Sequence, residues 1–178
     1  MAGTLKSRES RTARITRQVR KQAHGYADGH DRPLGSYLMI SGAYGAVVAG
    51  MGAFVAVSRR RLPDHFRWAD LGLLAVATHK VSRQLAKDPV TSPLRAPFTR
   101  YSGTSGESEV AEEVRGSGPR KAVGELVTCP FCLDQWVATA GIFGLIVAPR
   151  PTRAAASIFA VLAGADVLQF AYARLEES

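Results

Sequence analysis

Hydrophobic residues gather in long runs along this chain, and three of the runs are long enough to cross a bilayer. Residues 34–57 carry no charged side chain, and residues 154–173 carry only Asp166. A third run covers residues 130–148, where a helix that starts at a proline continues into an apolar stretch. Such runs are too long and too uniformly apolar for the helices of a small soluble domain. They predict membrane-spanning helices.

A weaker fourth candidate covers residues 66–85. Its apolar core is short, because Asp70 lies near one end and His79, Lys80 and Arg83 lie near the other. These charges allow a short span, an interfacial helix or a re-entrant segment.

We take this segment as a span, so the predicted fold is all-α, an integral membrane helical bundle with four transmembrane segments. Residues 1–32 then form a basic cytoplasmic tail, residues 33–178 form the multi-pass membrane domain, and residues 86–123 form a long ordered loop. In this topology most of the 23 Lys and Arg residues share the side of the two termini and the loop. Since cytoplasmic segments carry the excess of Lys and Arg, both termini are expected inside. A cluster at residues 59–61 opposes this orientation.

The formal net charge of +8 is concentrated toward the N-terminal tail, where arginines recur at every third residue from Arg8 to Arg20. A helix there would form a basic strip that binds anionic lipid head groups. Nucleic acid would be attracted by the same charges, but the tail has no interleaved aromatic residues, so no specific nucleic acid is expected. The simplest interpretation is a solvated tail that sets the orientation.

The long loop is the segment whose composition suits neither lipid nor a continuous helix. Three prolines interrupt residues 87–101, and an acidic helical turn is expected within residues 107–115. Phe98 and Tyr101 are expected to lie at the membrane surface, where aromatic side chains anchor. Loops of this length inside a small protein are usually functional. The candidate residues for an interaction are Arg95, Phe98, Arg100 and Tyr101.

Cys129 and Cys132 are the two cysteines of the chain, and the sequence Cys-Pro-Phe-Cys opens the third apolar run. In a redox site, the helix N-terminus would favour a thiolate and the second thiol would close a disulfide. In a zinc site, two thiolates would need two further ligands, with His79 as one candidate. In a structural role, both would pack as small residues in a reducing cytoplasm. The structural role is the simplest, and all three stay open.

Asp166 is a charged residue deep within the last predicted span, where an unpaired charge is costly. It can pair with His79, Lys80 or Arg83 across the bundle, or handle a proton or cation. We expect a structural ion pair, with Lys80 as the candidate partner.

Small residues recur at a spacing of four in the first and last spans, which permits close helix packing. We expect this packing within the chain, with a homo-oligomer as the alternative. The strips are Gly42, Ala46 and Gly50; Gly45, Ala49 and Ala53; and Ala156, Ala160 and Gly164.

Three segments carry a specific pattern: Thr78-His79-Lys80, the Thr-Ser-Pro-Leu-Arg-Ala-Pro-Phe run of residues 91–98, and Gly-Glu-Leu-Val-Thr-Cys-Pro-Phe-Cys at residues 124–132. They resemble the bacterial family called domain of unknown function 1360, which includes the YjcA-type sporulation membrane proteins. The similarity covers about residues 71–172. It implies a small multi-pass protein of the bacterial cell membrane with no assigned enzymatic activity, and nothing in these residues encodes sporulation.

Two functions from different classes fit the sequence. The first is a non-enzymatic scaffold whose cytoplasmic loop binds a protein partner. The alternative is a membrane thiol-disulfide oxidoreductase or a zinc-binding protein that uses Cys129 and Cys132. No Ser-His-Asp arrangement, HExxH motif or phosphate-binding glycine pattern supports a hydrolase or a nucleotide-dependent enzyme.

Overall fold

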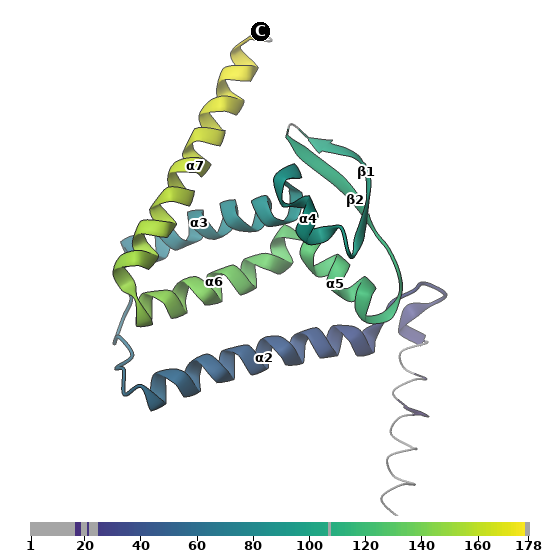
Figure 1. Cartoon of the computed structure of the whole chain (residues 1–178), viewed down its shortest axis with the longest axis horizontal. Coiled ribbons are helices and arrows are strands. Elements are labelled where there is room, and N and C mark those ends of the chain that lie inside the picture. The colour runs from purple at the N-terminus through teal and green to yellow at the C-terminus, as the bar shows by residue number, and fades with distance from the viewer. Residues whose placement is uncertain (1–16, 19–20, 22–24, 107, 177–178) are drawn as a thin grey trace, which may run out of the picture.

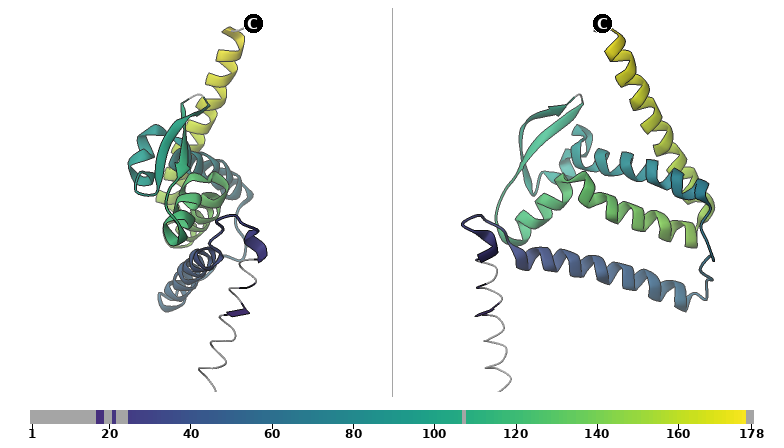
Figure 2. Two further views of the ribbon diagram at one scale, coloured as in Figure 1. Left: turned by 90° about the vertical axis from the view of Figure 1, so that its right-hand side faces the viewer. Right: turned by 180° about the vertical axis from the view of Figure 1, so that it is seen from behind.

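The structure, a computed structural model, describes residues 17–18, 21, 25–106 and 108–176. Most of the predicted basic strip, residues 8–20, therefore lies outside the described residues. The long helices of the described part are α2 (Leu34–Val57), α3 (Trp68–Lys87), α6 (Pro130–Val147) and α7 (Pro149–Glu176). In Figures 1 and 2, α6 lies between α2 and α3; α2 and α6 run in one direction and α3 runs in the other, while α7 starts beside α3 and leans away from it.

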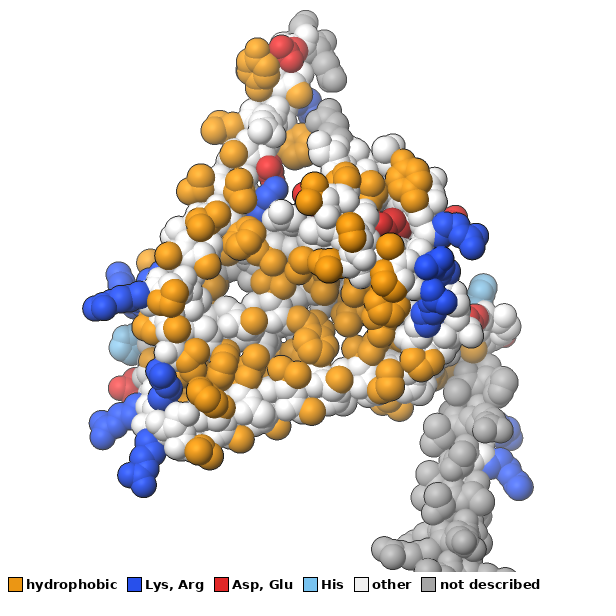
Figure 3. Space-filling view, viewed as in Figure 1, with side chains coloured by type: hydrophobic (Ala, Val, Ile, Leu, Met, Phe, Trp, Pro, Cys, Tyr) orange, Lys and Arg blue, Asp and Glu red, His pale blue; other side chains and the backbone are white. Residues whose placement is uncertain are grey.

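Three of these helices, α2, α6 and α7, are long and apolar enough to cross a membrane. Only 6% of the apolar window of each one is buried within the protein. A soluble protein rarely leaves so much apolar surface open to water. Figure 3 shows hydrophobic side chains over the helices, with Lys and Arg side chains gathered at the two ends of the molecule. This distribution is compatible with a membrane protein.

The helix α3 is too rich in charged residues to belong to that group, yet it lies at the centre of the packing. Its Leu74 and Ala77 meet Leu145 of α6 and Ala156 of α7 in the buried core. Gly141 permits the close approach of α6, because a Cβ atom at this position would lie 2.9 Å from Cδ2 of Leu74. The fold therefore depends on a helix whose own hydrophobic signal is weak.

The small-residue strips behave differently from the expectation. At Gly42, Gly45, Gly50 and Gly164 an added Cβ would meet no atom within 4 Å. The expected packing within the chain is therefore wrong at these four glycines, although Ala156 of the last strip is buried in the core. The helix glycines that do permit close contact are Gly141 and Gly144 of α6 and Gly124 of α5, none of which the strips included.

The segment between α3 and α6 is folded, and it corrects the all-α prediction. Its elements are η1 (Pro89–Thr91), α4 (Ser92–Arg95), β1 (Thr99–Gly106), β2 (Glu109–Val114) and α5 (Gly118–Thr128). The strands pair antiparallel, from Thr99 opposite Val114 to Gly106 opposite Glu109. The acidic helical turn expected here is wrong, because pairing with β1 satisfies the backbone of β2 and turns Val110 inward, where it is 9% exposed. We call residues 88–128 the loop domain.

The loop domain closes where α5 packs against the hairpin. A Cβ atom at Gly124 of α5 would lie 2.6 Å from Cγ1 of Val114 and 3.1 Å from the carbonyl oxygen of Phe98. The backbone cannot retreat without separating α5 from β2, so only glycine fits.

We predict that Gly124→Ala destabilises the loop domain by about 1–3 kcal/mol because the added methyl group overpacks this contact. The better helix propensity of alanine, worth up to about 1 kcal/mol, offsets part of that cost. Hydrogen exchange of the β2 amides measures the effect. Gly42→Ala, at an open position of α2, is the control and should leave β2 protection unchanged. Equal protection in wild type and Gly124→Ala would contradict the packing described.

Candidate functional site

The loop domain is built around Arg95, whose side chain is 1% exposed. Its guanidinium donates to the carbonyl oxygens of Leu85 at 2.6 Å and Asp88 at 3.0 Å, and to Oγ1 of Thr91 at 2.6 Å. These acceptors lie at the C-terminal end of α3 and just after it, where helix carbonyls lack partners of their own. One side chain thus joins the end of α3 to the loop domain.

Glu112 of β2 completes this centre. Nε of Arg95 lies 2.7 Å from Oε2 of Glu112, and Nη2 lies 3.1 Å from Oε1, which is a two-pronged pair. Burial by itself would raise the pKa of Glu112, but the hydrogen bonds and charge of Arg95, helped by Thr99 and Ser92, hold that pKa below its usual range. The carboxylate is therefore ionised at neutral pH, and the buried charge of Arg95 is compensated.

The four residues predicted for an interaction lie at different depths. Arg95 is interior, so its guanidinium has partners within the chain rather than at the surface. Phe98 is half-buried beside Gly124. Arg100 and Tyr101 of β1 are exposed, with Tyr101 at 65%. Because successive side chains of a strand point to opposite faces, β1 offers one exposed cation on one face of the hairpin and one exposed aromatic ring on the other.

Two further cations lie at the base of the hairpin, next to the segment that precedes β1. Arg115 donates to the carbonyl oxygen of Ala96 at 2.8 Å, and Nε of Arg120 donates to that of Pro97 at 3.0 Å. Both guanidinium groups are fixed by neutral acceptors, and no carboxylate among the described residues forms an ion pair with either. Figure 3 shows Lys and Arg side chains gathered at this end of the molecule. The arrangement leaves positive charge available to an anionic partner.

The two cysteines lie where α5 gives way to α6. Cys129 is the N-cap of α6, and its Sγ accepts a hydrogen bond from the backbone N–H of Cys132 at 3.2 Å. Both thiols are free; Cys129 is half-buried and Cys132 is exposed. Pro130 occupies the first helical turn, which needs no N–H donor there. The geometry suits a structural cap and leaves the redox interpretation open.

His79, the proposed third zinc ligand, is exposed on α3. The described part of the chain contains no group of three or more His, Cys, Asp or Glu side chains placed to hold a metal ion. A zinc site at Cys129 and Cys132 would therefore need ligands from outside the described residues.

Lys80 and Asp166 are brought together by the structure, with Nζ of Lys80 2.5 Å from Oδ2 of Asp166. The pair joins α3 to the middle of α7, and both side chains are partly exposed. Pairing lowers the cost of placing either charge at membrane depth.

Other polar side chains of α3 also have partners that sequence reasoning did not name. Nε and Nη2 of Arg153 donate to the two carboxylate oxygens of Asp70 at 2.8 and 2.7 Å. Ser82 donates to the carboxylate of Asp134 on α6, and Arg83 donates to Glu109 at the start of β2. Each pair joins residues far apart in sequence, so no local pattern identifies it.

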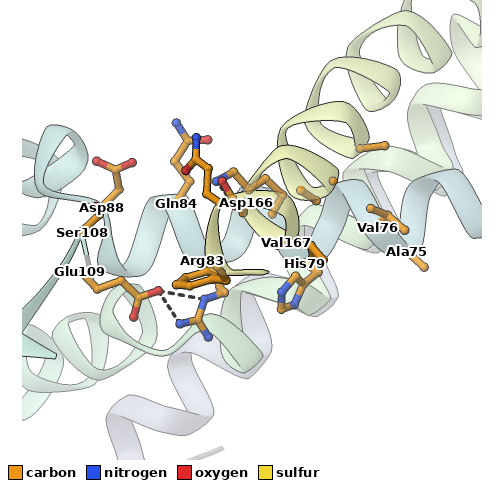
Figure 4. Close-up of a pocket in the computed structure, with 16 residues that line it drawn as sticks. Ala75, Val76, His79, Arg83, Gln84, Asp88, Ser108, Glu109, Asp166 and Val167 are labelled. Atoms are coloured by element: carbon orange, nitrogen blue, oxygen red, sulfur yellow. Dashed lines mark hydrogen bonds and ion pairs between the residues drawn. The ribbon is translucent and has the colours of Figure 1, made fainter. Parts of the chain in front are cut away.

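A cleft opens between α3, α7 and the tip of the hairpin, with a volume of about 840 Å³. Figure 4 shows His79, Arg83 and Gln84 on α3, Asp166 and Val167 on α7, and Glu109 at the hairpin. The Arg83–Glu109 pair belongs to the lining of this cleft, which combines charged and apolar side chains.

Comparison with known proteins agrees with the resemblance seen in the sequence. A family model described as "Protein of unknown function (DUF1360)" matches residues 73–172. The chain is also 27% identical over 100 residues to "Sporulation protein YjcA" of Bacillus subtilis (strain 168), and the match covers 54% of this chain and 85% of that protein. No solved structure matches the chain.

We predict that the loop domain loses stability on acidification. Because the pKa of Glu112 is depressed in the folded state, its pairing contributes fully above the unfolded pKa of about 4.3 and is lost as pH falls through the lower folded value. Hydrogen-exchange protection factors of the β2 amides, measured from pH 7 to pH 3, should fall below about pH 4.3. In Glu112→Gln this acid-dependent step should be absent. An identical acid profile in both proteins would show that the pair does not hold the domain.

Proposed function

We propose that this chain, which belongs to the DUF1360 family of proteins of unknown function, is a membrane-anchored scaffold that presents its loop domain to a protein partner. The observation that carries the proposal is the folded loop domain, which buried Arg95 ties to the end of α3. A simple connection between two helices would not need a hairpin, two short helical turns and a buried ion pair. These elements hold the surface of the loop domain rigid, and a preorganised surface loses less entropy on binding.

We propose that α3 crosses the membrane together with α2, α6 and α7. Because α3 runs opposite to α2 and α6, and α7 starts at the end of the layer where α6 stops, the helices suit four consecutive crossings. The charged groups of α3 do not oppose this, because Asp70, Lys80 and Arg83 have partners within the protein. Both termini and the loop domain would then share one side, and the excess of Lys and Arg on that side supports a cytoplasmic location.

The arginine cluster of residues 59–61 is compatible with this orientation. Nη1 of Arg60 donates to the carbonyl oxygen of Val147 at 2.7 Å. Val147 is the last residue of α6, so this arginine serves a helix C-terminus, where a cation is favoured. Part of the opposing charge therefore has a structural reason to be on that side.

The partner surface is strand β1 of the hairpin, with Arg100 exposed on one of its faces and Tyr101 on the other. Tyrosine and arginine are the residue types that contribute most to protein interfaces. Arg115 and Arg120, which have neutral acceptors rather than carboxylate partners, would steer an acidic protein surface toward this hairpin. Arg95 and Phe98 would support the surface from within.

We predict that Arg100→Ser with Tyr101→Ser removes partner binding while the protein stays folded, since both side chains are exposed. A photoreactive residue at exposed Thr104 of β1, introduced into the full chain in bacterial membranes, would report the partner as a cross-linked adduct. The adduct should disappear in the double variant.

The matched control is Arg150→Ser with Tyr172→Ser, which removes the same residue types from exposed positions of α7. The control should keep the adduct. Retention of the adduct in the loop variant, or its loss in both variants, would argue against this surface.

The second candidate is a membrane thiol-disulfide oxidoreductase. One observation favours it: Cys129 caps the N-terminus of α6, and its Sγ accepts the N–H of Cys132. The same donors would stabilise a thiolate. The exposed Cys132 could then form the disulfide, while electrons pass to a lipid quinone or a partner thiol.

The scaffold proposal predicts that both thiols stay reduced and that Cys129→Ser with Cys132→Ser lowers stability without removing any turnover. Alkylation and mass spectrometry across redox buffers from about −320 to −120 mV, the range of cellular dithiol couples, test it. A reversible loss of two hydrogens within that range would instead favour the oxidoreductase. Cys132→Ser alone is the control, since it cannot form the intramolecular disulfide.

A further inference from the structure

The cleft between α3 and α7 is wedge-shaped. The two helices are joined at one end by Asp70 and Arg153 and diverge toward the loop domain, where the hairpin tip closes the wide end. Its volume of about 840 Å³ lies within the range of about 300–1,000 Å³ typical of ligand sites.

The lining changes from apolar to charged along the length of the cleft. At its inner part the walls are small apolar side chains, among them Ala75 and Val76 of α3 and Ala163 of α7. Toward the hairpin the walls carry Arg83 and Glu109. An occupant that matches both parts must be an amphiphile, with its polar head beneath the hairpin and its chain toward the interior of the bundle.

The charges of the cleft select the kind of head group. Lys80 and Arg83 are balanced by Asp166 and Glu109, and Asp88 adds a further carboxylate to the lining. An anionic head group would satisfy the cations but would face these carboxylates. A zwitterionic head group supplies an anion and a cation together, and therefore suits a site of near-zero net charge.

We propose that this cleft binds one phosphatidylethanolamine molecule. Its phosphate would accept hydrogen bonds from Nη1 of Arg83, whose Nε and Nη2 already donate to Glu109, and from the exposed ring of His79. Its ammonium group, with three N–H donors, would donate to Glu109 and Asp88. The choline group of phosphatidylcholine has no N–H donor, so that lipid would leave the carboxylates without hydrogen bonds. One acyl chain would lie along the apolar wall.

This inference rests on the proposed function only in requiring that the cleft open to a bilayer; it does not require the protein partner. Because the tip of β2 supplies Glu109, the bound lipid would connect the loop domain to α7.

Native mass spectrometry of the full chain tests the proposal. The delipidated protein is supplied with equal amounts of phosphatidylethanolamine, phosphatidylcholine and phosphatidylglycerol that carry the same acyl chains. We expect the phosphatidylethanolamine adduct to exceed each of the others by about tenfold, which corresponds to a net gain of one charge-assisted hydrogen bond. Arg83→Gln with Glu109→Gln should reduce this adduct to the level of phosphatidylcholine. The control, Arg115→Gln with Glu113→Gln, should keep it.

A second variant fills the apolar part without disturbing charges. Gly164 lines the cleft, and a Cβ atom there meets nothing within 4 Å, so Gly164→Leu is expected to fold and to reduce the phosphatidylethanolamine adduct. Gly45→Leu, at an equally open position on α2, should not.

Equal adducts of the three lipids, or a preference for phosphatidylglycerol, would overturn the proposal. Equally strong binding of soluble glycerophosphoethanolamine would overturn it as a lipid site, because the apolar wall would then contribute nothing. The delipidated protein could instead form a dimer that the Gly164→Leu variant does not form. That result would mean that a second copy of the chain, rather than a lipid, occupies the cleft. Arg100→Ser with Tyr101→Ser should leave the adduct unchanged, so failure of the lipid site and failure of the partner surface are distinguishable.

Discussion

The structure depends on one constraint, which is that the polar side chains of α3 must find partners inside the protein. Asp70 pairs with Arg153 of α7, Ser82 with Asp134 of α6, and Lys80 with a carboxylate in the middle of α7. In the proposed topology α3 lies within hydrocarbon, where no water could replace these partners. A helix that carries such groups would then have to lie between its neighbours, and α3 does pack against both α6 and α7. The polar groups that weaken its hydrophobic signal are the groups that fix its position.

The same principle extends into the loop domain at the end of α3. Arg95 donates hydrogen bonds to carbonyl groups that the C-terminus of α3 leaves without partners, and the carboxylate of Glu112 compensates the charge of Arg95. Because these contacts join α3, α4 and β2, the loop domain cannot rotate freely with respect to the helices. In the proposed topology, a partner that binds the hairpin would therefore engage a surface fixed to the membrane anchor, and Arg83 with Glu109 would extend that connection to the lipid cleft.

The sequence was sufficient for features that a local pattern encodes. Long apolar runs predicted α2, α6 and α7, and the depth of Asp166 led to Lys80 as its candidate partner. The hairpin was missed because residues 109–114, read locally, suit an acidic helix; their strand conformation follows from pairing with β1 and from the buried pair with Arg95. Long-range contacts of this kind leave no periodic pattern in the sequence. The cleft also leaves none, because its lining residues come from distant segments of the chain.

The central claim is that α3 crosses the bilayer, and two single cysteines test it most directly. In a Cys129→Ser, Cys132→Ser background, Asp64→Cys places a thiol between α2 and α3, and Ser117→Cys places one between β2 and α5; both positions are exposed. A membrane-impermeant maleimide applied to right-side-out and inverted vesicles reports the side of each thiol. The account predicts labelling of Asp64→Cys from outside and of Ser117→Cys from the cytoplasmic side. Labelling of both from the same side would contradict it.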